Sequence, residues 1–157
     1  MPALHLLFSV YTRDMTLTDW TIRLSLIFLS GLGLWSCLYF AQEEFNVRNK
    51  KTPHHQFTCA DGSCIMLART PWARIFGIPN WYLGGAYYVL VILAAVISNE
   101  LLIGLAMLGA AFSTIMSVVL MYGLAVKLKV FCKFCYLAHF ANIAILFVWT
   151  FVLYSLL

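Results

Sequence analysis

The sequence carries little charge. Only 10% of its 157 residues are Asp, Glu, Lys or Arg, whereas 63% are hydrophobic. Soluble domains contain about 25% charged residues, and the mean hydropathy of this chain is +0.89. This composition excludes an ordinary soluble domain and indicates a protein embedded in a lipid bilayer.

Other features are absent as well. No cluster of basic residues is interleaved with aromatics, so the net charge of +4 favours acidic lipid head groups over nucleic acid as a partner. The sequence has no internal repeat and no low-complexity segment. Residues 1–11 are apolar but lack the basic n-region of a signal peptide. We interpret residues 1–19 as an N-terminal tail.

Four apolar segments are long enough to cross a bilayer, which requires about 20 predominantly apolar residues. They cover approximately residues 20–41, 81–98, 100–126 and 132–157. Helices are expected, because an open strand edge cannot be satisfied in lipid. The second and third segments are nearly continuous, which predicts an antiparallel hairpin with Asn99 capping the third helix. The predicted fold class is an all-α membrane protein, a bundle of four transmembrane helices.

The loop 42–80, between the first and second helices, begins with a polar part that shows no hydrophobic periodicity. Further along, Thr70 resembles an N-cap, and the proline after it suits the first helical position. Gly77 is a typical helix stop. We therefore expect a short surface helix from Pro71 to Phe76, lying on the membrane surface or over the mouth of the bundle.

Four of the five cysteines form two close pairs, Cys59 with Cys64 in the loop and Cys132 with Cys135 at the start of the last helix. Two membrane crossings separate the pairs, so both are expected at the same face of the membrane. The fifth, Cys37, shares a small-residue face of the first helix and is interpreted as a packing residue.

The last helix gathers its reactive and polar side chains on one side. With residues about 100° apart, one narrow stripe contains Cys132, Cys135, His139, Asn142 and Thr150. Lys133 points away from this stripe. Because polar groups in a membrane helix normally face the bundle interior or a cavity, the stripe predicts a pocket for an amphipathic ligand below the cysteine pair. A bundle interface held together by a few polar residues is the alternative.

These residue types favour thiol–disulfide exchange. A C-x-x-C pair at a helix N-terminus gains thiolate character from the positive end of the helix dipole, and three nearby lysines, Lys127, Lys129 and Lys133, add positive charge. The loop pair could exchange with a partner protein and then with Cys132. The same four cysteines have spacings compatible with a tetrahedral zinc site. Such a site would leave the polar stripe unexplained, and no metal is expected.

Three motifs occur in order along the chain: the loop pair Cys59–Cys64, the segment PWARIFGIP at 71–79 with Gly84 beyond it, and FCKFC at 131–135. With the order helix, cysteine loop, two helices and a fourth helix that starts at C-x-x-C, the sequence resembles the vitamin K epoxide reductase (VKOR) family of membrane thiol–quinone oxidoreductases, and its bacterial branch in particular. The resemblance covers roughly residue 20 to the end, which we take as one VKOR-like domain, 20–157.

The resemblance implies that Cys132 and Cys135 are the redox centre, with Cys135 nearest a bound quinone. It also implies that Cys59 and Cys64 are the shuttle, with Cys64 exchanging with Cys132 while Cys59 faces a thioredoxin-like partner. Electrons would pass from that partner to a quinone of the ubiquinone, menaquinone or vitamin K type, so that the protein generates disulfides. Reduction of a vitamin K epoxide by the same cysteines, as in animal members, is the alternative.

Five residues are expected to contact the quinone: His139, Asn80, Asn142, Phe76 and Tyr88. The His and the two Asn side chains could hydrogen-bond quinone carbonyls, and the two aromatic rings would form pocket walls. The sequence departs from animal members at His139, where they often have tyrosine, and in the closer spacing of its loop cysteines. No thioredoxin domain follows the fourth helix, so a separate thiol partner is expected.

Two arguments give opposite predictions for the side of the membrane that the cysteines face. The resemblance favours an extracytoplasmic site, facing a periplasm or lumen. The positive-inside rule points the other way, because basic residues are more numerous on the cysteine side: Arg48, Lys50, Lys51, Arg69, Arg74, Lys127, Lys129 and Lys133. The opposite side has Arg13 and Arg23.

Overall fold

The computed structural model describes residues 17–49, 74–75, 77–129 and 131–155. Four long helices dominate this part of the chain: α2 (Leu17–Arg48), α4 (Asn80–Ile97), α5 (Glu100–Tyr122) and α6 (Lys133–Ser155). A π-helical turn, η2 (Gly123–Leu128), extends α5. Each long helix contains a stretch that is long and apolar enough to span a membrane, which confirms the predicted all-α bundle of four transmembrane helices.

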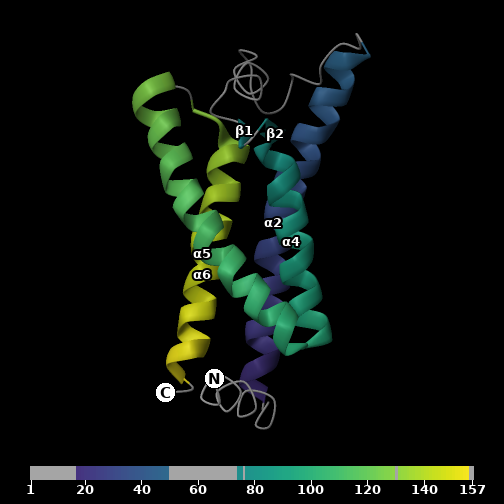
Figure 1. The fold of residues 1–157 in the computed structure, drawn as a ribbon, viewed down its shortest axis with the longest axis vertical. Coiled ribbons are helices and arrows are strands. Elements are labelled where there is room, and N and C mark those ends of the chain that lie inside the picture. The colour runs from purple at the N-terminus through teal and green to yellow at the C-terminus, as the bar shows by residue number, and fades with distance from the viewer. Residues whose placement is uncertain (1–16, 50–73, 76, 130, 156–157) are drawn as a thin grey trace.

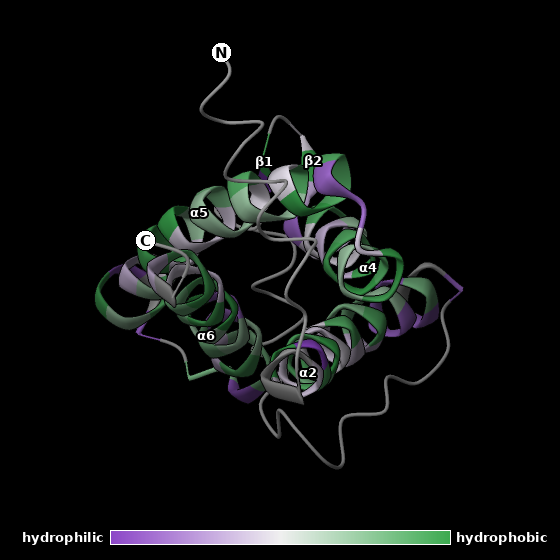
Figure 2. Cartoon of the chain, turned by 90° about the horizontal axis from the view of Figure 1, so that it is seen from below, coloured by the Kyte–Doolittle hydropathy of each residue, from purple (hydrophilic) through white to green (hydrophobic). Residues whose placement is uncertain are grey.

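The four helices stand around a common axis (Figure 2), and each packs against two others: α2 on α4 and α6, and α5 on α4 and α6. α2 ends and α6 begins at the same end of the bundle (Figure 1), which we call the cysteine end. The α4–α5 connection and the end of α6 lie at the opposite end. The segment that follows α2 and the C-x-x-C pair therefore start from one face of the bundle, as the crossing count predicts.

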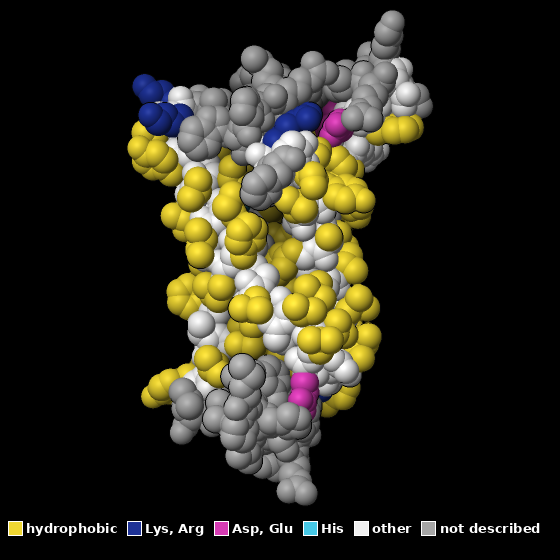
Figure 3. Space-filling view, in the orientation of Figure 1, with side chains coloured by type: hydrophobic (Ala, Val, Ile, Leu, Met, Phe, Trp, Pro, Cys, Tyr) yellow, Lys and Arg dark blue, Asp and Glu magenta, His cyan; other side chains and the backbone are white. Residues whose placement is uncertain are grey.

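The lateral surface is apolar. Hydrophobic side chains cover the side seen in Figure 3, and the visible charged side chains lie near the two ends. Many of the largest exposed side chains are hydrophobic, among them Phe28, Trp35, Leu108, Phe147 and Phe151. A soluble protein rarely exposes so much contiguous apolar surface, so this surface is suited to lipid tails.

The small-residue face of α2 allows close packing with α4. Ser30 and Cys37 are buried on it. A Cβ atom placed on Gly33 would lie 2.1 Å from Cζ of Tyr88, so the Tyr88 ring occupies the space that the glycine leaves open. Small residues let membrane helices approach closely, and here the approach brings a large aromatic ring of α4 into the bundle core.

The hairpin between α4 and α5 has the predicted cap. The side-chain Oδ1 of Asn99 accepts hydrogen bonds from the backbone N–H groups of Leu101 and Leu102, at 3.0 and 3.3 Å. Ser98 adopts a left-handed conformation with φ of 56° and ends α4. Arg23 of α2 donates to the carbonyl oxygen of Ala95 at 3.3 Å, which places a cation near the negative end of the α4 dipole.

Two expectations for the loop 42–80 are wrong. α2 continues to Arg48, so the polar residues 42–48 extend a helix instead of opening a loop. Gln42, Glu43 and Glu44 are good helix formers, and a helix end that leaves the bilayer requires no apolar period.

The expected short helix from Pro71 to Phe76 is also not formed where the structure describes it. β1 (Arg74–Ile75) pairs with β2 (Ile78–Pro79) in an antiparallel hairpin, whereas 71–73 and Phe76 lie outside the described residues. Gly77 has φ of +82°, a conformation that glycine readily adopts in a tight turn. Pro79 disfavours helical geometry in the residue before it, so the signals interpreted as a helix stop belong to a turn.

Candidate functional site

Cys132 occupies the N-cap position of α6. It directly precedes Lys133, the first helical residue, and its carbonyl oxygen accepts the N–H of Tyr136 at 3.0 Å. Its Sγ accepts the backbone N–H of Cys135 at 3.3 Å. A sulfur atom thus takes the place that a Ser or Asp oxygen usually has at a helix start, where the helix dipole favours negative charge.

These hydrogen bonds affect the acidity of Cys132. A side-chain hydrogen bond with Cys135 is the largest cause that lowers the pKa of the Cys132 thiol, and the backbone amides of Phe134 and Cys135 act in the same direction, whereas burial opposes them. No disulfide joins Cys132 and Cys135 in this structure. Cys132 is therefore the member of the pair that is prepared to act as a thiolate.

Three elements enclose the pair. Leu124 of η2 and Cys132 form a buried cluster, and Phe40 of α2 packs against this cluster together with Phe134 and Cys135. Cys132 itself has no exposed surface. The ring of Phe134 stacks on Tyr39 of α2, with centroids 4.3 Å apart. The start of α6 is thus fixed against α2 at the level of the reactive sulfurs.

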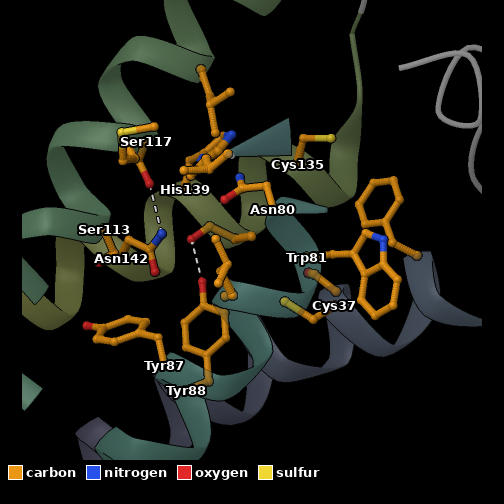
Figure 4. Close-up of a pocket in the computed structure, with 18 of the residues that line it drawn as sticks. Cys37, Asn80, Trp81, Tyr87, Tyr88, Ser113, Ser117, Cys135, His139 and Asn142 are labelled. Atoms are coloured by element: carbon orange, nitrogen blue, oxygen red, sulfur yellow. Dashed lines mark hydrogen bonds between the residues drawn. The ribbon is translucent and has the colours of Figure 1, made fainter. Parts of the chain in front are cut away.

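Below the pair lies a cavity of about 210 Å³. Its walls come from all four long helices, η2 and β1. Cys135, His139 and Asn142 contribute the α6 wall, and Figure 4 shows these side chains along one side of the cavity. The predicted stripe of α6 therefore faces a pocket, and a thiol forms part of the pocket wall.

Two side chains that line this cavity each have a buried polar atom without a partner among the described residues. Asn142 donates from Nδ2 to the Ser117 hydroxyl at 2.8 Å, and its backbone carbonyl oxygen accepts a hydrogen bond from the Thr114 hydroxyl at 3.2 Å. Its Oδ1, and Nδ1 of the buried His139, have no hydrogen-bond partner within the described part of the chain. Buried polar atoms normally have partners, so these two side chains are candidates for binding a polar ligand.

Asn80 and Tyr88 also line the cavity. Asn80 is the first residue of α4 and lies near His139 and Cys135 in Figure 4. The Tyr88 hydroxyl is already used, because it donates to the carbonyl oxygen of Ala138 at 3.0 Å. Tyr88 therefore offers a ligand its ring and not its hydroxyl.

The structure brings together most of the predicted site. The described members that line one cavity are Cys135, His139, Asn142, Asn80 and Tyr88. Cys132 lies behind Cys135, against Leu124. Phe76, Cys59 and Cys64 lie outside the described residues.

Thr150 was predicted on the pocket stripe, and this is wrong. Its side chain is exposed and donates to the carbonyl of Phe147, one turn earlier, at 2.9 Å. The hydroxyl is satisfied within its own helix. The buried face of the lower half of α6 is formed by Ile145, Trp149 and Val152 instead.

Several cavity residues were missed at the sequence level. Ser36 and Cys37 of α2 and Ser113 and Ser117 of α5 all line the cavity. The spacing of the two α5 serines, four residues apart, puts both on one helix face and could have suggested a polar contact. Cys37 packs beside Gly84, whose added Cβ would lie 3.3 Å from its sulfur. It is a packing residue, as expected, but its position is also on the cavity wall.

Comparison with known proteins agrees with this architecture. A family model described as the vitamin K epoxide reductase family matches residues 24–150, a range that includes all four long helices in whole or in part and the C-x-x-C pair. Among curated proteins, no sequence matches the chain. With the thiol of a C-x-x-C pair on the wall of a pocket among the membrane helices and a family match over most of its length, the chain belongs to the vitamin K epoxide reductase family of membrane thiol/quinone oxidoreductases.

Proposed function

We propose that the protein oxidises a thioredoxin-like thiol partner and reduces a quinone, and so generates disulfides. The observation that carries this proposal is the position of Cys135. This thiol lies on the wall of a cavity that His139 and Asn142 also line. Each of these two side chains has a buried polar atom without a partner in the described residues, Nδ1 of His139 and Oδ1 of Asn142. A cavity with mostly apolar walls and a few polar atoms suits a quinone ring.

The residues fit such a ligand. His139, Asn142 and Asn80 would hold its polar oxygens, while Tyr88 and the apolar walls would contact the ring. The quinone would supply a two-electron acceptor next to Cys135. Within the protein, the two thiols of Cys132 and Cys135 lose two electrons and two protons and form one disulfide, which matches the conversion of one quinone to one hydroquinone.

The electron path upstream follows the family resemblance. The partner would reduce the Cys59–Cys64 disulfide, and the resulting thiols would reduce Cys132–Cys135 through a mixed disulfide between Cys64 and Cys132. The low pKa of Cys132 favours it as the sulfur that exchanges, because a stable thiolate is a good leaving group. We place the cysteine end on the extracytoplasmic side of the membrane.

The test uses the purified full-length protein in lipid nanodiscs, with dithiothreitol as electron donor and a soluble short-chain quinone as acceptor. Turnover is expected in the wild type and in Thr150→Val, an exposed control on α6, and no turnover is expected in Cys135→Ala. Retained turnover in Cys135→Ala would contradict the assignment of Cys135.

Two parallel measurements separate the alternatives. The same assay with a vitamin K epoxide would identify an epoxide reductase if the epoxide were reduced and the quinone were not. Metal analysis of the purified protein addresses the zinc module. One zinc per chain with no turnover on either acceptor would overturn the redox function.

A further inference from the structure

Glu43 of α2 is a buried acid to which the proposed electron path assigns no role. Its side chain is only 5% exposed, and its Oε2 has no hydrogen-bond partner among the residues that the structure describes. The next residue, Glu44, differs, because its Oε2 accepts a hydrogen bond from Trp81 Nε1 at 3.1 Å. Burying a carboxylate is unfavourable unless it is paired. A buried ionisable residue with an unpartnered atom at the end of a helix bundle is for this reason a candidate functional group.

The helix geometry places Glu43 on the cavity-facing side of α2, near the cysteine end. Ser36, Phe40 and Glu43 follow one another at spacings of four and three residues and so share one face of α2. Ser36 and Phe40 line the cavity, and Phe40 also packs against the cluster of Leu124 and Cys132. Glu43 lies three residues after Phe40 and therefore about 4.5 Å further along the helix axis, towards the cysteine end. Glu43 therefore lies on the cavity-lining face of α2 at the cysteine end of the bundle (Figure 1), a level that we call the rim.

The other charged groups described at this rim are mostly cations on the outside. Arg74 of β1, Lys127 and Lys129 at the end of η2, and Lys133 of α6 are all exposed. None of them reaches Oε2 of Glu43 within hydrogen-bond distance. On α4, Asn80 is neutral and Trp81 bonds Glu44. Among the described residues at the start of α6, the titratable side chains that are not exposed are Cys132 at the N-cap, Cys135 and Tyr136, and the buried His139 follows one turn further on.

Thiol–disulfide exchange needs a group that moves one proton. An ordinary thiol has a pKa of about 8.5, so an attacking thiol is mostly protonated at neutral pH and must lose its proton. The leaving sulfur must gain one, because a thiolate is poorly solvated in an apolar site. A carboxylate held at the same rim can do both in turn.

We propose that Glu43 carries this proton during exchange at Cys132, an inference that rests on the proposed thiol oxidoreductase function. The sulfur of the incoming thiol forms a bond with Sγ of Cys132, and its proton passes to the Glu43 carboxylate. The Cys132–Cys135 bond breaks, and its electron pair goes to Sγ of Cys135. Cys135 then takes the proton from Glu43, directly or through one water. The products are a mixed disulfide at Cys132 and a thiol at Cys135, and Glu43 is again a carboxylate.

The experiment measures the exchange half-reaction without quinone. The full-length protein carries Cys59→Ser and Cys64→Ser, so that the oxidised Cys132–Cys135 pair is the disulfide that reacts. Its reduction by dithiothreitol is stopped with acid at successive times, and the new thiols are labelled with a maleimide of high mass. Rates are measured between pH 6 and pH 8, about the range over which the thiols of dithiothreitol begin to ionise. They are compared between this background and three variants made in it: Glu43→Gln, Glu43→Asp and Glu44→Gln.

Glu43→Gln keeps the shape of the side chain but cannot carry a proton. We expect it to slow exchange by about 100-fold at the acidic end of the range, the scale of a general acid–base group. Its rate should then rise by about ten-fold per pH unit, following the thiolate fraction of the probe, whereas the rate of the Glu43 background should rise less steeply. Glu43→Asp should recover part of the rate, and the matched control Glu44→Gln should stay within about two-fold of the background.

Two results would overturn the proposal. One is a Glu43→Gln rate equal to that of the background at every pH. The other is an equal slowing in Glu43→Gln and Glu43→Asp with the pH profile of the background retained, which would give Glu43 a structural role only. Failure of the wild type to reduce quinone would refute the proposed function separately, because the exchange rates contain no quinone step.

Discussion

The hydroxyl of Tyr88 donates a hydrogen bond to the carbonyl oxygen of Ala138, across 3.0 Å between α4 and α6. The acceptor directly precedes His139 in the sequence and belongs, like it, to the cavity wall. The ring of the same tyrosine fills the space that Gly33 of α2 leaves open. One side chain thus fixes three helices around the cavity.

Tyr88→Phe should weaken this arrangement without removing the ring. We expect a loss of about 1 kcal/mol of stability, typical of one hydrogen bond, and a several-fold higher KM for quinone with little change in kcat. Thermal unfolding in nanodiscs and steady-state kinetics measure the two effects. Wild-type values for both would show that the bond to Ala138 positions nothing.

Gly33→Ala should be far more harmful than its position in a helix suggests. The new Cβ would lie 2.1 Å from the Tyr88 ring, so the ring or the helix must shift, at a cost of about 1–3 kcal/mol for an overpacked core. Gly31→Ala is the matched control, since its Cβ would meet nothing within 4 Å. Equal unfolding temperatures for the two variants would contradict the close packing of α2 on α4.

The acidity of Cys132 should depend on Cys135. In a chain with Cys37, Cys59 and Cys64 changed to serine, the ultraviolet absorbance of the thiolate reports the titration. Because the hydrogen bond with Cys135 is the main cause that lowers the Cys132 pKa, Cys135→Ala should move the titration of Cys132 to higher pH. A midpoint that stayed in place or moved to lower pH would exclude this cause.

Asn142→Leu should impair quinone binding. It removes the unpartnered Oδ1 and the bond to Ser117 while keeping the size of the side chain. We expect about a ten-fold rise in KM, equivalent to roughly 1.4 kcal/mol, within the range of a lost hydrogen bond. Thr150→Val on the exposed side of α6 should leave KM unchanged. Parallel changes in both variants would indicate a general loss of helix stability.

The membrane side of the site can be tested in intact cells. After mild reduction, an impermeant maleimide should label Cys59 if the cysteine end faces outwards. Labelling only after the membrane is opened would place the cysteines in the cytoplasm, in agreement with the positive-inside rule and against our proposal.

The sequence was sufficient to predict the elements that depend on hydropathy and local capping. The four spans, the Asn99 cap and the C-x-x-C pair at a helix start are all present in the structure, because each depends on residues close together in the chain. The stripe from Cys135 through His139 to Asn142 was also predictable, since helical period alone puts these residues on one side.

The wrong and missing predictions concern features that local patterns do not determine. The polar end of α2 showed no apolar period, yet its helix continues because its residues favour helix outside the bilayer. Thr150 has the same angular position on α6 as the stripe, but its side chain is exposed. The neighbouring helices do not cover this side of α6 at the level of Thr150. The partnership of Asn142 with Ser117 and the use of the Tyr88 hydroxyl by Ala138 require the tertiary structure.

Because the Cys132 sulfur accepts the Cys135 amide hydrogen at the N-cap of α6, the proposed redox centre and the helix start are one feature. A sulfur in a disulfide is a weaker acceptor than a thiolate, so oxidation and mixed-disulfide formation remove part of the cap. The first turn of α6 should therefore loosen and tighten once in each catalytic cycle, and the exchange rate of the Cys135 amide hydrogen becomes a direct record of the oxidation state.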